Sequence, residues 1–118
     1  MNTKSRVFAV ADYIQTSDGD PVRSVVLETA ESVIVVWYVL PGQEIMAHTH
    51  PQGQDTWTVL SGGAEYFQGD GVVCKINTGE IVVARPGQVH GARNTGTVPF
   101  VFVSVVASGN AGYAPAER

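Results

Sequence analysis

Short runs of β-branched and aromatic residues alternate with turn residues along most of the chain. Such side chains fit the pleated surface of a sheet, and the Gly, Asn and Pro residues between the runs supply turn conformations. The runs predicted to be strands are residues 22–27, 33–40, 45–50, 56–60, 64–67, 72–76, 81–84 and 100–106. Residues 7–14 could hold one short turn of helix. Short strands at near-regular spacing predict an all-β sandwich or barrel.

Two of the predicted strands are apolar on both faces, residues 33–40 throughout and residues 100–106 nearly so. A barrel wall buries only its inward-facing side chains, so the outward-facing ones need a second layer. That layer is either a partner subunit or the N-terminal segment folded back over the sheet. We expect a homodimer.

Composition narrows the class of protein. A length of 118 residues predicts a single domain, residues 1–118. The net charge of −4 and the lack of a Lys/Arg cluster argue against nucleic acid or an anionic membrane as a partner. The start of the chain lacks the apolar run of a signal peptide, and the longest apolar run, residues 33–40, is too short to cross a bilayer. We therefore expect a soluble cytoplasmic protein, with its lone Cys74 unable to form an internal disulfide.

The three histidines of the chain are the candidate functional residues. His48 and His50 are two residues apart in a predicted strand, so both side chains lie on one face, together with Met46. Neutral imidazoles side by side are half of a coordination shell for a divalent metal. Asp55 begins the next predicted strand and shares a face with Trp57.

Two motifs surround these residues. The first, in residues 42–62, reads Gly42-x5-His48-x-His50-x4-Asp55-x6-Gly62. The second, in residues 79–94, reads Gly79-x5-Arg85-Pro86-Gly87-x2-His90-x3-Asn94. Together they resemble the two motifs of the cupin superfamily, and the short gap between them is similar to that of small single-domain microbial cupins. The family pattern has Glu in place of Asp55 and usually Pro in place of Arg85.

The resemblance implies a double-stranded β-helix, or jelly-roll barrel, with a metal in its mouth. The ligands carried over are His48, His50, Asp55 and His90. Three imidazoles and one carboxylate suit Fe, Mn, Co, Ni, Cu or Zn and disfavour Mg or Ca. Asp is one methylene shorter than Glu, so Asp55 is either a ligand or an acceptor that orients an imidazole. Gln54 is the neighbouring alternative, but it points to the opposite face.

A metal-binding site does not by itself identify the reaction that a protein catalyses. The first hypothesis is a metal-dependent enzyme of dioxygenase, isomerase or lyase type on a small organic substrate, with the metal as Lewis acid or O2 activator. The alternatives are a non-catalytic small-ligand binder or sensor, and a structural dimeric module stapled by its metal. No residue is assigned as catalytic, and the candidate general bases are Tyr66, Glu44 or a metal-bound hydroxide. The predicted pocket residues are Met46, Trp57, Tyr66 and Arg85, where Arg85 either holds an anionic substrate or is a solvated rim charge.

Overall fold

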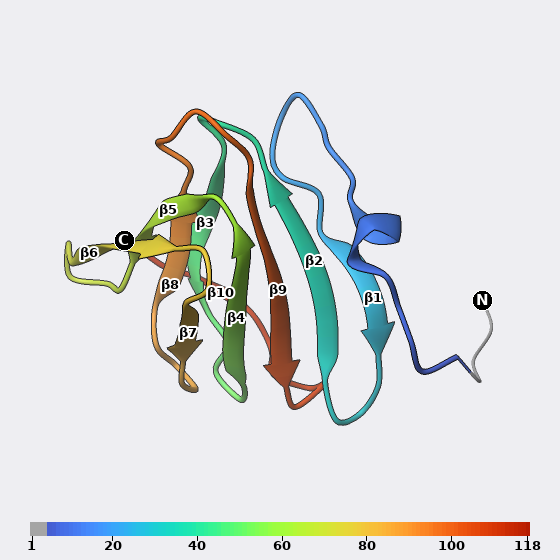
Figure 1. Ribbon diagram of the computed structural model, residues 1–118. Coiled ribbons are helices and arrows are strands. Elements are labelled where there is room, and N and C mark those ends of the chain that lie inside the picture. The colour runs from blue at the N-terminus through green and yellow to red at the C-terminus, as the bar shows by residue number, and fades with distance from the viewer. Residues whose placement is uncertain (1–4) are drawn as a thin grey trace.

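Two five-stranded antiparallel sheets face each other and enclose the core (Figure 1). The structure is a computed structural model that describes residues 5–118. Its elements are η1 (Val10–Tyr13), β1 (Ser24–Glu28), β2 (Val33–Val39), β3 (Glu44–Thr49), β4 (Gln54–Ser61), β5 (Gly63–Phe67), β6 (Val73–Asn77), β7 (Ile81–Ala84), β8 (His90–Arg93), β9 (Phe100–Ala107) and β10 (Ala114–Pro115). The strand orders are β1-β2-β9-β4-β7 and β10-β3-β8-β5-β6. Strands distant in sequence therefore pair within each sheet, and the predicted all-β jelly roll is confirmed.

All eight predicted strands are present, with ends within two residues of those expected. Two further strands, β8 and β10, were not predicted. The sequence of β8, His-Gly-Ala-Arg, has little β-propensity. It is a strand because β3 and β5 both pair with it, one on each side.

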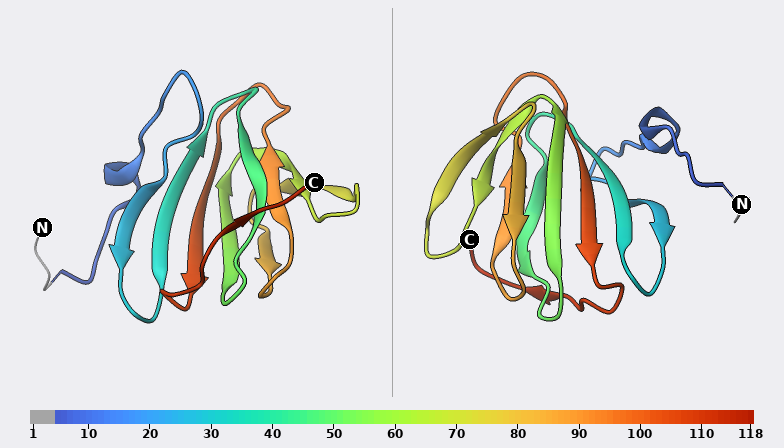
Figure 2. Two further views of the ribbon diagram at one scale, coloured as in Figure 1. Left: turned by 180° about the vertical axis from the view of Figure 1, so that it is seen from behind. Right: turned by 60° about the horizontal axis from the view of Figure 1, so that its bottom comes forward.

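The core fills one end of the space between the sheets. Phe100 and Phe102 on β9 are fully buried, and the Phe102 ring stacks on Trp57 of β4 at 4.1 Å. These residues follow Asp55 along β4 and precede Ser104 along β9. The other end of the same strands is thereby left for polar side chains. Figure 2 shows how the strands of the two sheets surround this space.

A β-bulge in β3 breaks the alternation that the sequence predicts there. Ile45 pairs with Ala92, but the next paired residue is His48 with His90, so β3 has one residue more than β8. Ile45 therefore belongs to the core and His48 also faces inward, three residues on. Met46, expected on the same face as His48, is instead 63% exposed.

Gly91 allows β8 to approach this bulge closely. A Cβ atom at Gly91 would lie 2.7 Å from the Ile45 carbonyl oxygen and 2.9 Å from the Ala47 Cα. Both are backbone atoms, which cannot rotate away. The backbone contact next to His90 therefore requires glycine.

The N-terminal segment supplies part of the second layer expected over the apolar strands. Phe8, Val10 and Tyr13 line a cavity together with Val36 of β2 and Val103 of β9. The segment thus folds back beside the outer face of the β1-β2-β9-β4-β7 sheet (Figure 2). Within residues 5–118, no helix is long and apolar enough to cross a membrane.

Candidate metal centre

The four ligands carried over from the motifs converge at one end of the barrel. His48 comes from β3, His50 directly follows it, Asp55 is in β4 and His90 begins β8. One side-chain nitrogen or oxygen from each lies within 4.8 Å of the others. Three of the side chains are buried, and His50 is 14% exposed. The bulge in β3 and the pairing of β3 with β8 bring His48 and His90 together, with ring centroids 4.2 Å apart.

Each imidazole is fixed by a backbone carbonyl on its Nδ1 side. The distances are 2.7 Å from His48 Nδ1 to Met46 O, 2.7 Å from His50 Nδ1 to Gly112 O, and 3.0 Å from His90 Nδ1 to Gln88 O. A carbonyl can only accept, so each Nδ1 carries the proton and donates it. In the neutral ring, each Nε2 then presents a lone pair to the cluster, as metal-ligating histidines do.

Asp55 reaches the imidazoles despite its short side chain. Its Oδ2 lies 3.0 Å from His90 Nε2 and 3.4 Å from His50 Nε2. Its Oδ1 accepts a hydrogen bond of 2.6 Å from the Ser104 hydroxyl, which fixes the carboxylate plane. With Nδ1 protonated, lone pairs on nitrogen and oxygen face each other at these contacts, and a proton or a metal cation between them relieves the repulsion.

The pKa shifts keep His48 and Asp55 in the forms that bind a metal, whereas the pKa shift of His50 favours its protonated form. Burial, and then the nearby His90, lower the pKa of His48 to about 4, so it is neutral at physiological pH. Burial acts to raise the pKa of Asp55, but hydrogen bonds with His50, His90 and Ser104 outweigh it and hold that pKa well below its usual range. The hydrogen bond to Asp55 raises the pKa of His50, while burial and the positive charge of Arg23 oppose this.

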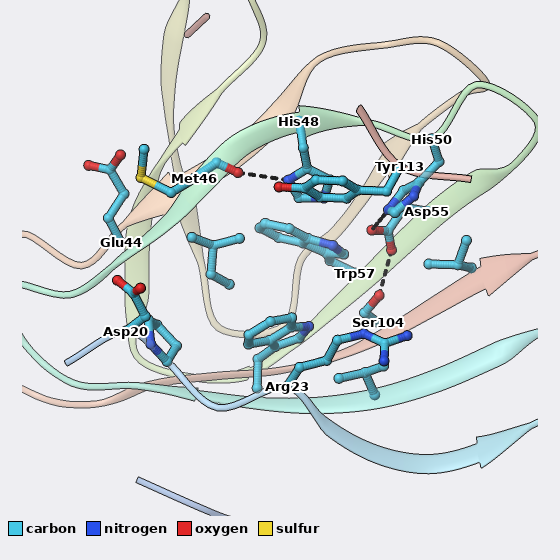
Figure 3. A pocket seen from close by; sticks show the side chains of 15 residues that line it. Asp20, Arg23, Glu44, Met46, His48, His50, Asp55, Trp57, Ser104 and Tyr113 are labelled. Atoms are coloured by element: carbon cyan, nitrogen blue, oxygen red, sulfur yellow. Dashed lines mark hydrogen bonds and ion pairs between the residues drawn. The ribbon is translucent and has the colours of Figure 1, made fainter. Parts of the chain in front are cut away.

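This donor set fits a divalent transition metal. Three nitrogens and one oxygen on a rigid sheet suit Fe, Mn, Co, Ni, Cu or Zn, whereas Mg and Ca prefer oxygen alone. Four protein donors leave coordination positions on an octahedral ion for a ligand. The cluster borders a cavity of about 240 Å³, from which such a ligand would enter (Figure 3).

Residues 35–106 match the model of the Cupin domain family, a segment that contains all four residues of the cluster. This chain belongs to the cupin family. The result confirms the resemblance carried by the two motifs and the jelly-roll fold.

Solved structures agree with this assignment. An uncharacterized conserved protein with a double-stranded β-helix domain from Klebsiella pneumoniae is 62% identical, covering 98% of this chain and 100% of that one, with a TM-score of 0.95. An RmlC-like cupin protein from Desulfovibrio desulfuricans is 25% identical over 86% of this chain and 95% of that one, with a TM-score of 0.74. A predicted oxalate decarboxylase from Thermotoga maritima, 18% identical over 80% of this chain and 97% of that one with a TM-score of 0.68, shares the fold alone. No curated protein matches the sequence significantly.

The structure of this cupin divides the predicted pocket residues into two groups. Met46 and Trp57 line the cavity beside the cluster, whereas Tyr66 and Arg85 do not. Tyr66 is on β5 of the opposite sheet and is 4% exposed; its ring packs edge-on against Trp57 at 5.3 Å, which places it behind the cavity wall. Arg85 is exposed in the turn after β7, away from the cavity. Of the four predicted pocket residues, these two do not line this cavity.

Other residues that line the cavity were missed by the sequence reasoning: Arg23, Trp37, Ser104 and Tyr113. Ser104 left a signal, because it is the one polar residue in the apolar run 100–106. Arg23 and Tyr113 left none, since they lie far from both motifs in sequence. The Tyr113 ring stacks on His48 at 5.1 Å and 25°, although the side chain is 62% exposed.

Proposed function

We propose that this cupin binds a divalent transition metal through His48, His50, Asp55 and His90 and is a metal-dependent enzyme acting on a small organic molecule. The observation that supports this most directly is the orientation of the imidazoles. Every Nδ1 is tied to a carbonyl, so every Nε2 is free to face the carboxylate at the wall of a cavity. A histidine buried only for packing does not need its Nε2 to face a carboxylate and two other imidazoles.

When bound, the metal supplies Lewis acidity toward a substrate oxygen, or O2 activation if it is iron, so the reaction is of oxidoreductase, isomerase or lyase type. The protein's own residues orient the molecule and exclude water. Trp57 forms an apolar wall, and the Tyr113 ring covers His48. Asp55 contributes one negative charge, which lowers the net charge of a divalent site to +1.

The direct test is metal content. Protein purified without a polyhistidine tag is analysed for transition metals, and the His48→Ala/His50→Ala double variant is compared with Gln54→Ala, which alters an exposed neighbour of Asp55. We expect near-stoichiometric metal in the wild type and in Gln54→Ala, and loss in the double variant. Unchanged metal content in the double variant would contradict the proposal.

A non-catalytic binding role is the second candidate, and one observation favours it. Of the side chains considered as general bases, Tyr66 lies outside the cavity, and Glu44 is paired with Arg93 at 3.4 Å and Arg118 at 3.3 Å. Turnover of small carbonyl compounds by the metal-loaded protein distinguishes the two candidates. Saturable binding without turnover would favour the binder.

We also propose a homodimer formed through the part of the outer sheet face that the N-terminal segment leaves uncovered. Across this face Val105 pairs with Thr56, and Thr56 with Val83, a row without charge. Val83 and the nearby Ile81 are 45% and 66% exposed. An exposed, uncharged face of this kind fits a second copy of itself. Light scattering at micromolar concentration should give twice the chain mass of 12.5 kDa, and the chain mass itself would contradict the dimer.

A further inference from the structure

The cavity beside the cluster has a guanidinium at one end and carboxylates at the other. Arg23 lies on the side of Ser104 and Asp55, whereas Asp20 and Glu44 lie on the other side (Figure 3). Glu44 is neutralised by Arg93 and Arg118. Asp20 adds a second carboxylate at that end.

The guanidinium of Arg23 is available to a ligand. Arg23 directly precedes β1, and its side chain extends along the cavity toward the end where Asp55 lies (Figure 3). No ion pair or side-chain hydrogen bond within residues 5–118 engages this guanidinium. Arg23 nonetheless lines the same cavity as His50 and Asp55. The guanidinium of Arg23 is therefore near the cluster but makes no ion pair with it.

The positive charge at the Arg23 end of the cavity favours an anionic ligand. In the proposed function the metal and Asp55 together contribute +1, and Arg23 raises the total to +2. A guanidinium presents parallel N–H donors that match the two oxygens of a carboxylate, and such charge-assisted pairs are among the strong hydrogen bonds of proteins.

The middle of the cavity is apolar. Val35 and Trp37 from β2, Trp57 from β4 and Val106 from β9 line it. An apolar lining with a few polar groups at its ends is the usual form of a small-molecule site. The ligand body between the two charged ends is therefore apolar.

We propose that Arg23 anchors the carboxylate of the substrate, so that this cavity selects small monocarboxylates with an apolar body. The inference rests on the proposed function, because the metal shares the positive end. At the other end the carboxylate of Asp20 repels a second carboxylate and accepts a hydrogen bond from a hydroxyl group.

Tryptophan fluorescence tests this directly, because both tryptophans of the chain, Trp37 and Trp57, line the cavity. Benzoate and phenylacetate are titrated into metal-loaded wild type, Arg23→Gln and Arg23→Lys, with Arg85→Gln as the matched control. Arg85 carries the same charge but lies outside the cavity. Melting temperatures establish that each variant is folded.

We expect Arg23→Gln to weaken binding of the better carboxylate about 10- to 100-fold, the usual cost of losing a charge-assisted hydrogen bond. Arg23→Lys should lose less, and Arg85→Gln less than about twofold, since an exposed distant charge is screened. Benzamide should bind weakly and should not respond to Arg23→Gln. 4-Hydroxybenzoate should bind more tightly than terephthalate, whose second carboxylate reaches the acidic end. Equal effects of Arg23→Gln and Arg85→Gln, or no binding of either carboxylate at millimolar concentration, would overturn the inference.

Metal analysis of the wild type beside these titrations separates this inference from the proposed function. If the wild type holds no metal but binding still depends on Arg23, the anchor stands and the metal proposal fails. If the wild type holds metal and Arg23→Gln binds like Arg85→Gln, the metal proposal stands and the anchor fails.

Discussion

Replacement of Asp55 by Asn is the sharpest test of how the cluster holds its metal. The amide has nearly the same shape as the carboxylate but lacks its charge. It can still accept the hydroxyl of Ser104 on Oδ1. With that oxygen turned to Ser104, however, the other end of the amide is an NH2 group, which offers hydrogen atoms rather than a lone pair to the metal.

The expected loss is at least that of an orienting partner, about 10- to 100-fold in metal affinity. A 100-fold loss at saturating metal removes about 2.7 kcal/mol of metal-induced stability. With an unfolding entropy of roughly 2.1 cal/mol/K per residue over the 118 residues, this lowers the metal-bound melting temperature by about 11 °C.

The quantity to compare is the rise in melting temperature on adding metal after chelator treatment. The metal-free variant is itself less stable, because the ionised carboxylate accepts hydrogen bonds in the folded state, and taking the difference removes that contribution. Gln54→Ala is the control, since this exposed neighbour points away from the cluster. Asp55→Glu, the residue of the family pattern, should retain binding. If Asn at position 55 leaves the rise and the affinity unchanged while His90→Ala abolishes both, Asp55 has no part in the site and a three-histidine site replaces it.

Three further predictions follow from the contacts of the cluster. Ser104→Ala removes the donor to Asp55 Oδ1, leaves that buried oxygen unpaired and should weaken metal binding about 10-fold in a competition titration; unchanged affinity would show that the carboxylate needs no such support. Gly91→Ala places a Cβ 2.7 Å from the Ile45 carbonyl and should destabilise the metal-free protein by about 1–3 kcal/mol in urea unfolding, against which an unchanged midpoint would count. Metal affinity should fall about tenfold per pH unit once the pH drops below the raised pKa of His50, because a proton on that imidazole must then be displaced. In the metal-free protein the stability that the raised pKa of His50 contributes is complete below about 6.5, the pKa of an unperturbed imidazole, and is lost as the pH rises through the raised pKa of the folded state. Calorimetric titrations between pH 5 and 8 check the last prediction, and a flat profile would remove His50 from the ligands.

The sequence by itself determined where the strands lie and which side chains form the cluster. Strand positions follow from local preferences, since runs of β-branched and aromatic residues bounded by Gly, Asn or Pro have few other stable conformations. The cluster was equally accessible, because His48 and His50 are near neighbours in one strand and the spacing of the motifs added Asp55 and His90. Strand preferences and motif spacings are properties of neighbouring residues or of fixed intervals along the chain. Both can therefore be read without a three-dimensional structure.

The tertiary structure alone decided the shape and charge of the cavity. β8 has too little β-propensity to be predicted, and pairing with two neighbouring strands makes it one. The bulge in β3 breaks the alternation that placed Met46 beside His48, so Met46 lines the cavity as a largely exposed side chain. Tyr66, which the sequence placed in the pocket, packs behind Trp57, whereas Arg23, for which the sequence suggested no role, lines the cavity from just before β1. These placements depend on which strands become neighbours, and contacts between segments far apart in the chain leave no periodic trace in either segment.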